Sequence, residues 1–299
     1  MKNKFSIIRT AVFWTVVFFL GIAPARSQEF QPPVPGENFQ DSPAEDQTFI
    51  AWSSDGINWK PEERPVFEHA SVADIFVTKS GQFLLCWVDF SKAEGPGSET
   101  LSMSNSTDGR QWSEPHSVEI RGMIAGNAVD PSLVELDGGK LRLYYFAPGP
   151  DEETHLIKSA VSSDGGKIFT EEEGVRVQGE GITDPDVIQK SDGTWIMYLS
   201  HGRETLIAVS SDGLNFEDTG AVVETGGVPG ALLLDDKRIR LFVTTREGIR
   251  SLISSDGISF VPEPGIRIPN IENSRITADP SLSRALDGKW VMAFKRRPS

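Results

Sequence analysis

The eight residues Ser162-Ser163-Asp164-Gly165-Gly166-Lys167-Ile168-Phe169 are the key to this sequence, because four close relatives of them recur along the chain. The relatives begin at Ser53, Ser106, Ser210 and Ser254, and each places Asp-Gly two residues later, ahead of a Trp or Phe. The five aspartates of these copies are spaced by 53, 56, 48 and 44 residues: Asp55, Asp108, Asp164, Asp212 and Asp256. Periods of this length are typical of propeller blades or solenoid units.

Each copy lies between two apolar or alternating runs, as residues 206–209 and 221–223 do around Asp212. Asp-Gly between such runs is a strong hairpin signal, because Gly accepts positive φ and Asp can bond to its own turn. We therefore expect each copy to be a tight turn between two outer strands, with the closing Trp or Phe packed against the blade. Five copies of one turn chemistry favour a structural role over a direct role in ligand binding.

A second repeated signal precedes each apolar strand pair. Its five copies begin at Asp74, Asp130-Pro131, Asp184-Pro185, Val228-Pro229 and Asp279-Pro280. Each is followed by a turn and then by a strongly apolar run, such as residues 141–146 or 195–199. Each unit therefore reads as four strands, and five units predict an all-β, five-bladed β-propeller.

The two ends of the chain predict how the propeller closes. The first Asp-Gly turn, at Asp55, precedes any inner strand, and the last inner pair, from Asp279 to Lys295, has no such turn after it. Residues 47–67 should therefore complete the outer half of the last blade, so that Asp55 and Asp279 belong to the same blade. Strand pairing between the chain ends would leave few unpaired edges.

The sequence predicts three segments: a signal peptide over residues 1–27, a flexible leader over 28–46 and the propeller over 47–299. The first has a basic start, an apolar run over 11–22 and small residues at 23–27. That apolar run is too short to span a bilayer readily, which disfavours a retained membrane anchor. We expect a secreted or periplasmic protein that is free of the membrane once the signal peptide is cleaved.

Composition restricts the classes of partner. The formal charge is −14, and loss of the three or four basic residues of the signal peptide, which has no acidic residue, would make it −17 or −18. Such an acidic chain argues against binding to nucleic acid or to an anionic membrane. The only cysteine, Cys86, lies in the apolar run 83–88, so we expect a buried core thiol. The sequence leaves the oligomeric state open.

The inner-strand aspartates are the candidate site, because the first strands of a propeller line its axis. We expect Asp74, Asp130, Asp184 and Asp279 to converge at one mouth of the axis, with Asp186 close by. Crowded carboxylates raise one another's pKa, so one could act as a general acid while another remains ionised as a base. Glycoside hydrolysis requires such a pair. The alternative is that an Asp before Pro satisfies backbone donors where a strand begins.

The same face should also carry basic residues and two glutamates. We expect His201, Arg203 and Arg275 to contribute to substrate binding there, and Glu180 and Glu224 lie in connections that enter this face. No spacing in the sequence resembles a zinc site, a phosphate-binding loop or a Ser-His-Asp set, so no cofactor is expected. A Ca²⁺ ion held on the axis by aspartates is possible, because hard cations prefer oxygen ligands.

The repeated Asp-Pro signals, each followed by Asp-Gly and an aromatic strand, resemble those of five-bladed propeller glycosidases: arabinanases, β-xylosidases and relatives of invertase. The resemblance covers residues 47–295. It implies a carbohydrate substrate, an inner-strand Asp as base or nucleophile, a second Asp that tunes its pKa, and a Glu as acid. By this resemblance Asp74 is the expected base and Asp184 the expected tuning residue, with Asp130 also matching by motif. The sequence departs from the pattern in having no Glu at the start of an inner strand, Val228 in the fourth copy and no Pro after Asp74.

The turns also resemble the Asp box of sialidases, although only the copy at Ser162 has its spacing. Sialidases have six blades, and no arginine triad or tyrosine nucleophile can be assigned in this chain. Three hypotheses follow: a glycosidase, a non-catalytic propeller that binds carbohydrate or protein, and a scaffold whose axis is capped by hydrogen-bonded aspartates. An open pocket with paired carboxyls would favour the first, and a filled axis would favour the last.

Overall fold

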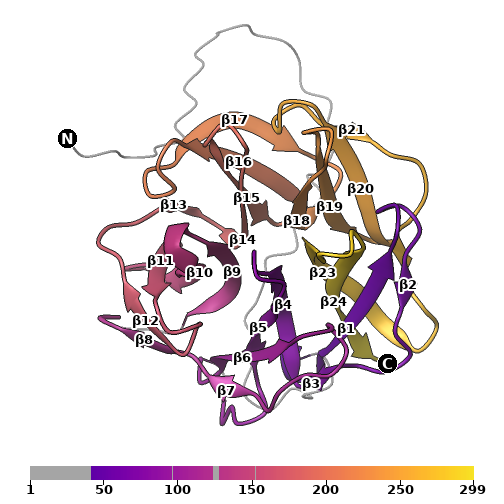
Figure 1. Ribbon diagram of the computed structural model, residues 1–299, viewed down its shortest axis with the longest axis horizontal. Coiled ribbons are helices and arrows are strands. Elements are labelled where there is room, and N and C mark those ends of the chain that lie inside the picture. Colours follow the sequence, from indigo (N-terminus) through magenta and orange to yellow (C-terminus); the bar gives the residue numbers. More distant parts are fainter. Residues whose placement is uncertain (1–41, 96, 124–127, 152) are drawn as a thin grey trace, which may run out of the picture.

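Five antiparallel sheets surround a central axis in the computed structural model, which describes residues 42–95, 97–123, 128–151 and 153–299 (Figure 1). The predicted all-β, five-bladed propeller is confirmed. The predicted signal peptide and most of the predicted leader lie outside the described residues. No helix within the described ranges is both long enough and apolar enough to cross a membrane.

The chain builds one blade after another, and within a blade the strands run from the axis outward. Blade 1 contains β4 (Ala70–Val77), β5 (Phe83–Asp89), β6 (Thr100–Ser106) and β7 (His116–Ser117). Blade 2 contains β9 (Val129–Glu135), β10 (Leu141–Pro148), β11 (Thr154–Ser162) and β12 (Ile168–Glu171), with β8 (Glu119–Arg121) beside β12 and β13 (Val177–Glu180) beside β11. Blade 3 contains β14 (Ile182–Gln189), β15 (Trp195–His201), β16 (Glu204–Ser210) and β17 (Glu217–Val223). Blade 4 contains β18 (Gly227–Leu233), β19 (Ile239–Thr245), β20 (Gly248–Ser254) and β21 (Val261–Pro262), with β22 (Ile268–Pro269) beside β20.

Blade 5 joins the two ends of the chain, as the sequence predicts. It contains β23 (Ser274–Arg284), β24 (Trp290–Pro298), β1 (Gln47–Ser53) and β2 (Lys60–Pro61), with β3 (Phe67–Glu68) beside β1. β1 pairs with β24 along its whole length, from Gln47 opposite Arg296 to Ser53 opposite Trp290. A short 3-10 helix, η2 (Pro43–Glu45), precedes β1 and contacts β4 and β24.

The core lies between blades, not within them. Five clusters of buried side chains each fill the space between two neighbouring blades. The second strand of a blade is covered on both sides, so β15 reads as a continuous apolar run and not as an alternating one. Cys86 is buried in one of these clusters, as expected.

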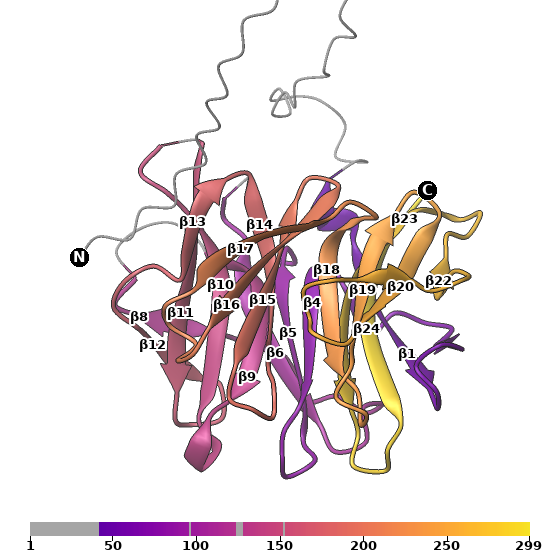
Figure 2. The ribbon, with the colours of Figure 1, turned by 90° about the horizontal axis from the view of Figure 1, so that it is seen from above.

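The Asp-Gly turns lie at the opposite ends of the blades from the starts of the inner strands (Figure 2). In the turn of blade 3, Oδ1 of Asp212 accepts hydrogen bonds from the backbone N–H groups of Leu214 and Asn215, both at 2.8 Å. These bonds hold the pKa of Asp212 below its usual range, against an opposing effect of partial burial. The Tyr144 hydroxyl of blade 2 donates to the Gly213 carbonyl at 2.7 Å, so the turn also fastens one blade to the next.

Buried arginine–glutamate pairs make a second kind of connection between blades. Arg240 of β19 donates to both carboxylate oxygens of Glu263, at 2.8 and 3.0 Å, and Ser251 donates to the same carboxylate at 2.7 Å. Another nitrogen of Arg240 reaches the Asp55 carbonyl in the turn of blade 5, at 3.4 Å. Arg142, Ser159 and Glu172 repeat this arrangement in blade 2.

Candidate functional site

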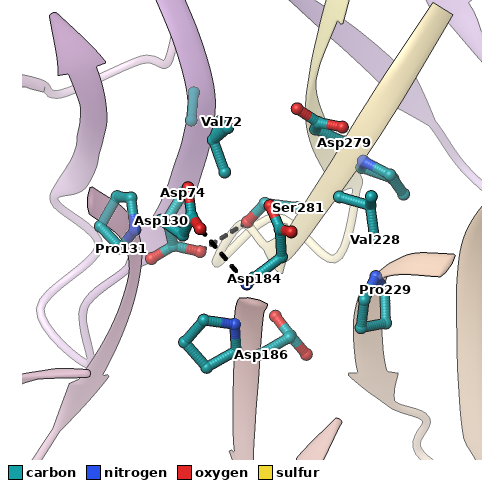
Figure 3. Close-up of a pocket in the computed structure, with 13 residues that line it drawn as sticks. Val72, Asp74, Asp130, Pro131, Asp184, Asp186, Val228, Pro229, Asp279 and Ser281 are labelled. Carbon is teal, nitrogen blue, oxygen red and sulfur yellow. Dashed lines mark hydrogen bonds between the residues drawn. The ribbon is translucent and has the colours of Figure 1, made fainter. Parts of the chain in front are cut away.

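A small depression marks one mouth of the propeller axis, where the five inner strands begin (Figure 3). Its volume is about 30 Å³, which is room for roughly two water molecules. Each blade contributes the same short stretch of its first strand to the lining, so five-fold pseudo-symmetry builds the site.

Each inner strand carries a β-bulge at this point, and one residue of every bulge has positive φ. These residues, here called the bulge position, are Val72 (φ 45°), Asp130 (φ 53°), Asp184 (φ 46°), Val228 (φ 48°) and Asp279 (φ 54°). The pairing with the second strand shifts register at the same place in all five blades. Asp is enriched at positive φ among residues other than Gly, whereas a β-branched Val there is strained. A structural preference thus accounts in part for the Asp residues at three of these sites.

The residue two places after each bulge position forms a second ring, here called the strut position. Its members are Asp74, Ser132, Asp186, Gly230 and Ser281. In four blades the side chain at the strut position accepts a hydrogen bond from the next blade. The donor is the backbone N–H of the residue directly after that blade's own strut position. The bonds run from Leu133 to Asp74 at 2.8 Å, from Val187 to Ser132 at 3.1 Å, from Ala231 to Asp186 at 2.8 Å and from Ile75 to Ser281 at 3.0 Å.

Gly230 occupies the fifth strut position because the inner strand of blade 5 comes very close there. A Cβ atom at residue 230 would lie 1.9 Å from the Pro280 carbonyl oxygen. The residues at the strut positions therefore serve the contacts between neighbouring blades around the axis. This ring is structural in character.

Asp74 lies in the strut ring and not in the bulge ring with Asp130, Asp184 and Asp279. The structure thus corrects the expectation that these four aspartates are equivalent, because Val72 occupies the bulge position of blade 1. The Asp74 carboxylate is 6% exposed, and its other oxygen accepts from the Ser281 hydroxyl at 2.6 Å. Burial raises its pKa to about 6, although both hydrogen bonds oppose the change.

Asp130 and Asp184 lie on neighbouring blades and interact directly. The Asp184 backbone N–H donates to Oδ2 of Asp130 at 3.4 Å, and the Thr183 hydroxyl donates to Oδ2 of Asp184 at 2.6 Å. Burial raises the pKa of Asp184 to about 6, with a further contribution from the charge of Asp279. Burial and the nearby charge of Asp184 raise the pKa of Asp130 well above its usual range. Among the described residues, neither carboxylate forms an ion pair.

Asp279, the third carboxylate at a bulge position, is paired. Nζ of Lys295 in β24 lies 2.5 Å from Oδ2 of Asp279 and 3.2 Å from Oδ2 of Asp46. Burial raises the pKa of Asp279, and the ammonium group of Lys295 opposes this effect. The same two carboxylates raise the pKa of Lys295, so Lys295 is a cation at neutral pH.

The other predicted site residues divide into two groups. Asp186 lines the depression from its strut position, as the sequence predicts for a residue close to the aspartate ring. His201, Arg203 and Arg275 are exposed and do not line the depression. Glu180 in β13 and Glu224 after β17 are also exposed and away from it, so neither supplies the missing acid at the axis.

Metal binding has no preformed cage in the parts of the chain that the structure describes. No group of three or more His, Cys, Asp and Glu side chains there is arranged to hold a metal ion. The neutralisation of Asp279 by Lys295 leaves two unpaired carboxylates, Asp130 and Asp184, at the bulge positions. Two carboxylates provide fewer oxygen atoms than the six to eight ligands that Ca²⁺ usually takes.

One residue connected to this mouth through Lys295, Asp46, has no signal in the sequence. It was assigned to the leader, yet it is fully buried and contacts β4 and β24. Its partners Ser71 and Arg297 lie 25 and 251 residues away in the sequence. No local pattern could have revealed these contacts.

The comparisons with known proteins support the fold. No family model and no curated protein matches the sequence. Among solved structures, a fructofuranosidase of Schwanniomyces occidentalis in complex with fructose matches with a TM-score of 0.58 and 18% identity, over 72% of this chain and 50% of that one. A family 117 glycoside hydrolase of the marine bacterium Zobellia galactanivorans matches with a TM-score of 0.58 and 13% identity, over 85% and 92% of the two chains.

A β-1,3-galactosidase of glycoside hydrolase family 43, solved with galactodeoxynojirimycin, is also similar, with a TM-score of 0.56, 14% identity and coverage of 74% and 84%. The chain spans only half the length of the fructofuranosidase. The resemblance to propeller glycosidases is thereby confirmed for the fold. At these identities the likeness concerns architecture, and function depends on the site.

Proposed function

We propose that this protein is a glycosidase-like propeller that binds a carbohydrate over the axial mouth, with Asp130 and Asp184 as the groups that recognise it. The observation that carries the proposal is the contact between these two carboxylates at equivalent bulges of neighbouring blades. Neither forms an ion pair of its own among the described residues, although Lys295 lies near enough to lower the pKa of both. Carboxylate oxygens accept hydrogen bonds from hydroxyl groups, and such bonds are stronger than those between neutral groups. The depression is small, so we place the ligand across its mouth.

The likeness to solved propeller glycosidases supports this choice of ligand class. Two of them were solved in complex with fructose and with galactodeoxynojirimycin. The acidic mouth also suits a neutral, hydroxyl-rich ligand better than an anionic one, because like charges repel.

Hydrolysis is the second candidate function. It is favoured by the contact between Asp130 and Asp184 and by burial, which raises the pKa of both carboxyl groups. Near pH 6 one carboxyl of such a pair is protonated while the other is ionised. The protonated carboxyl of Asp130 would give its proton to the glycosidic oxygen as the bond from that oxygen to the anomeric carbon breaks. Asp184 would take a proton from the water whose oxygen bonds to the anomeric carbon, so one proton is given and one is taken.

Asp74 is less suited to act as the base in this scheme. Both of its carboxylate oxygens are occupied by Leu133 and Ser281 within the strut ring. The assignment therefore moves from Asp74, expected from the resemblance, to Asp184.

The test is a screen of the full chain against oligosaccharides and aryl glycosides, by thermal shift and by product release, in EDTA and in Ca²⁺. Asp130→Asn and Asp184→Asn should each weaken glycan-dependent stabilisation at least tenfold. The matched control is Asp287→Asn, an exposed residue of the turn between β23 and β24, which should leave binding unchanged. The Ca²⁺ arm tests whether an ion binds on the axis.

The outcomes separate the two candidates. Product release that follows a bell-shaped pH profile and disappears in both Asn variants supports hydrolysis. Binding without product release supports the binding function and excludes hydrolysis of those substrates. Glycan binding that is unchanged in both folded Asn variants would contradict the proposed site.

A further inference from the structure

The segment just before the first strand is connected to the axial mouth through the side chain of Asp46, which contacts Lys295, the partner of Asp279. Asp46 is fully buried, and its carboxylate receives three side chains from two elements. Arg297 donates at 2.6 and 3.2 Å, Ser71 donates at 2.7 Å and Lys295 lies at 3.2 Å. The Asp46 carbonyl also accepts from the Ala70 backbone N–H at 2.9 Å.

Lys295 connects this cluster to the ring of bulge positions. Its single ammonium group lies between Asp46 and Asp279 and also donates to Ser71 at 3.2 Å. Arg297 in turn neutralises Asp46, so the four charged groups alternate in sign along the chain of contacts. Removal of any one of these charges changes the electrostatic interactions among the others at the axis, because the side chains are buried and are poorly screened by solvent.

We propose that Asp46 is a positioning residue of the axial mouth. By binding Lys295, it determines how strongly the Lys295 ammonium group interacts with the Asp279 carboxylate. The segment Ser42–Asp46 is then part of the site and not part of a leader. The inference concerns the charge state of the mouth and does not depend on which ligand the protein binds. It can fail while the proposed function holds, and the reverse is also true.

The direction of the effect follows from the contacts. The charged groups that face Asp279 are two cations on β24 and three other carboxylates: Lys295, Arg297, Asp46, Asp130 and Asp184. Without the charge of Asp46, Lys295 has one strong acidic partner instead of two, and a negative charge near Asp279 is lost. Both changes favour the ionised form of Asp279, so its pKa should fall.

The test measures the titration of Asp279 directly, in the full chain, by NMR of protein labelled with ¹³C at the aspartate carboxyl groups. The Asp279 signal is assigned by its absence in Asp279→Asn. In Asp46→Asn the pKa of Asp279 should fall by about one unit, and in Lys295→Met it should rise by at least as much. A purely structural role for Asp46 would lower the melting temperature and leave this titration in place.

Two further variants make the result decisive. Arg297→Met keeps Asp46 but removes its second cation, so Asp46 should draw Lys295 away from Asp279 and raise the pKa of Asp279. Asp89→Asn is the matched control, since Asp89 ends β5 on the same face and accepts from Ser102 at 2.7 Å without contacting Lys295. An Asp279 titration that is the same in wild type, Asp46→Asn and Arg297→Met would overturn the proposal, and Arg297→Met still tests it if Asp46→Asn does not fold.

Discussion

The Ser281 hydroxyl donates a hydrogen bond to Oδ1 of Asp74 at 2.6 Å, across 207 residues of sequence. The bond joins the inner strand of the last blade to that of the first. Asp74 accepts a second bond from the Leu133 backbone N–H of the following blade, so one carboxylate connects three blades. This relationship explains why an aspartate with a motif typical of catalysis acts here as a strut.

Replacing Asp74 by Ala should destabilise the protein without abolishing the fold. The change leaves the Leu133 N–H and the Ser281 hydroxyl without their acceptor, and each unsatisfied buried group costs about 1–3 kcal/mol. We expect a loss of about 2–4 kcal/mol in the free energy of unfolding, measured by urea denaturation. Asp89→Ala, at a half-buried strand end, should cost less than half as much. Equal costs would contradict the strut role.

The raised pKa of Asp74 should make stability depend on pH. Its pKa is about 6 when folded and near 3.8 when unfolded, so the folded state keeps the proton longer. Stability should therefore decrease as the pH rises from about 4 to about 6, and then level off. In Asp74→Asn this contribution, on the order of 2 kcal/mol, is absent. Parallel urea titrations at pH 4, 5, 6 and 7 measure it, and an identical slope in both proteins would contradict the assignment.

Replacing Val228 by a polar residue should stabilise the protein. It has φ of 48° at the bulge position of blade 4, where a β-branched side chain is strained and Asn or Asp is not. Val228→Asn should raise the free energy of unfolding by about 0.5–1 kcal/mol. Val222→Asn in strand β17, exposed and without positive φ, serves as the control and should bring no gain. A destabilised Val228→Asn protein would mean that the side chain contributes more by packing than it loses by strain.

The buried pair of Arg240 and Glu263 should matter far more than a surface pair. Glu263→Gln leaves two buried arginines, Arg240 and Arg267, without their carboxylate, and breaking a buried pair in this way costs about 3–5 kcal/mol. Glu119→Gln breaks the exposed pair with Arg121 and should leave stability nearly unchanged, because solvent screens the pair. Thermal and urea unfolding of both variants provide the comparison. A small effect of Glu263→Gln would show that the arginines find other acceptors.

The propeller could be predicted from the sequence because its signals are local and repeated. An Asp-Gly turn such as that at Asp212 forms its own hydrogen bonds, and five copies at a blade-like period leave few alternatives. Closure through the N-terminal strand followed from the offset between the two repeats at Asp55 and Asp279. Both inferences depend on contacts within a few residues or on simple counting.

The site could be predicted only in part, since its details depend on contacts between blades. The bulge that separates Val72 from Asp74 is visible in backbone angles and strand register. In the sequence alone, Asp74 aligns with Asp130. Asp46 gave no signal because its partners come from strands far along the chain. The depth of the depression likewise depends on how five strands meet.

The pairing of β1 with β24 also determines when the propeller can close during synthesis. During synthesis strand Gln47–Ser53 emerges before the other strands that the structure describes, but its partner Trp290–Pro298 emerges after them. Four blades can assemble from neighbouring segments while β1 waits with its edge unpaired, and contacts between such distant segments form slowly. The newly made chain thus carries an exposed strand until its final residues are available, which makes this strand the place where misassembly or aggregation would begin.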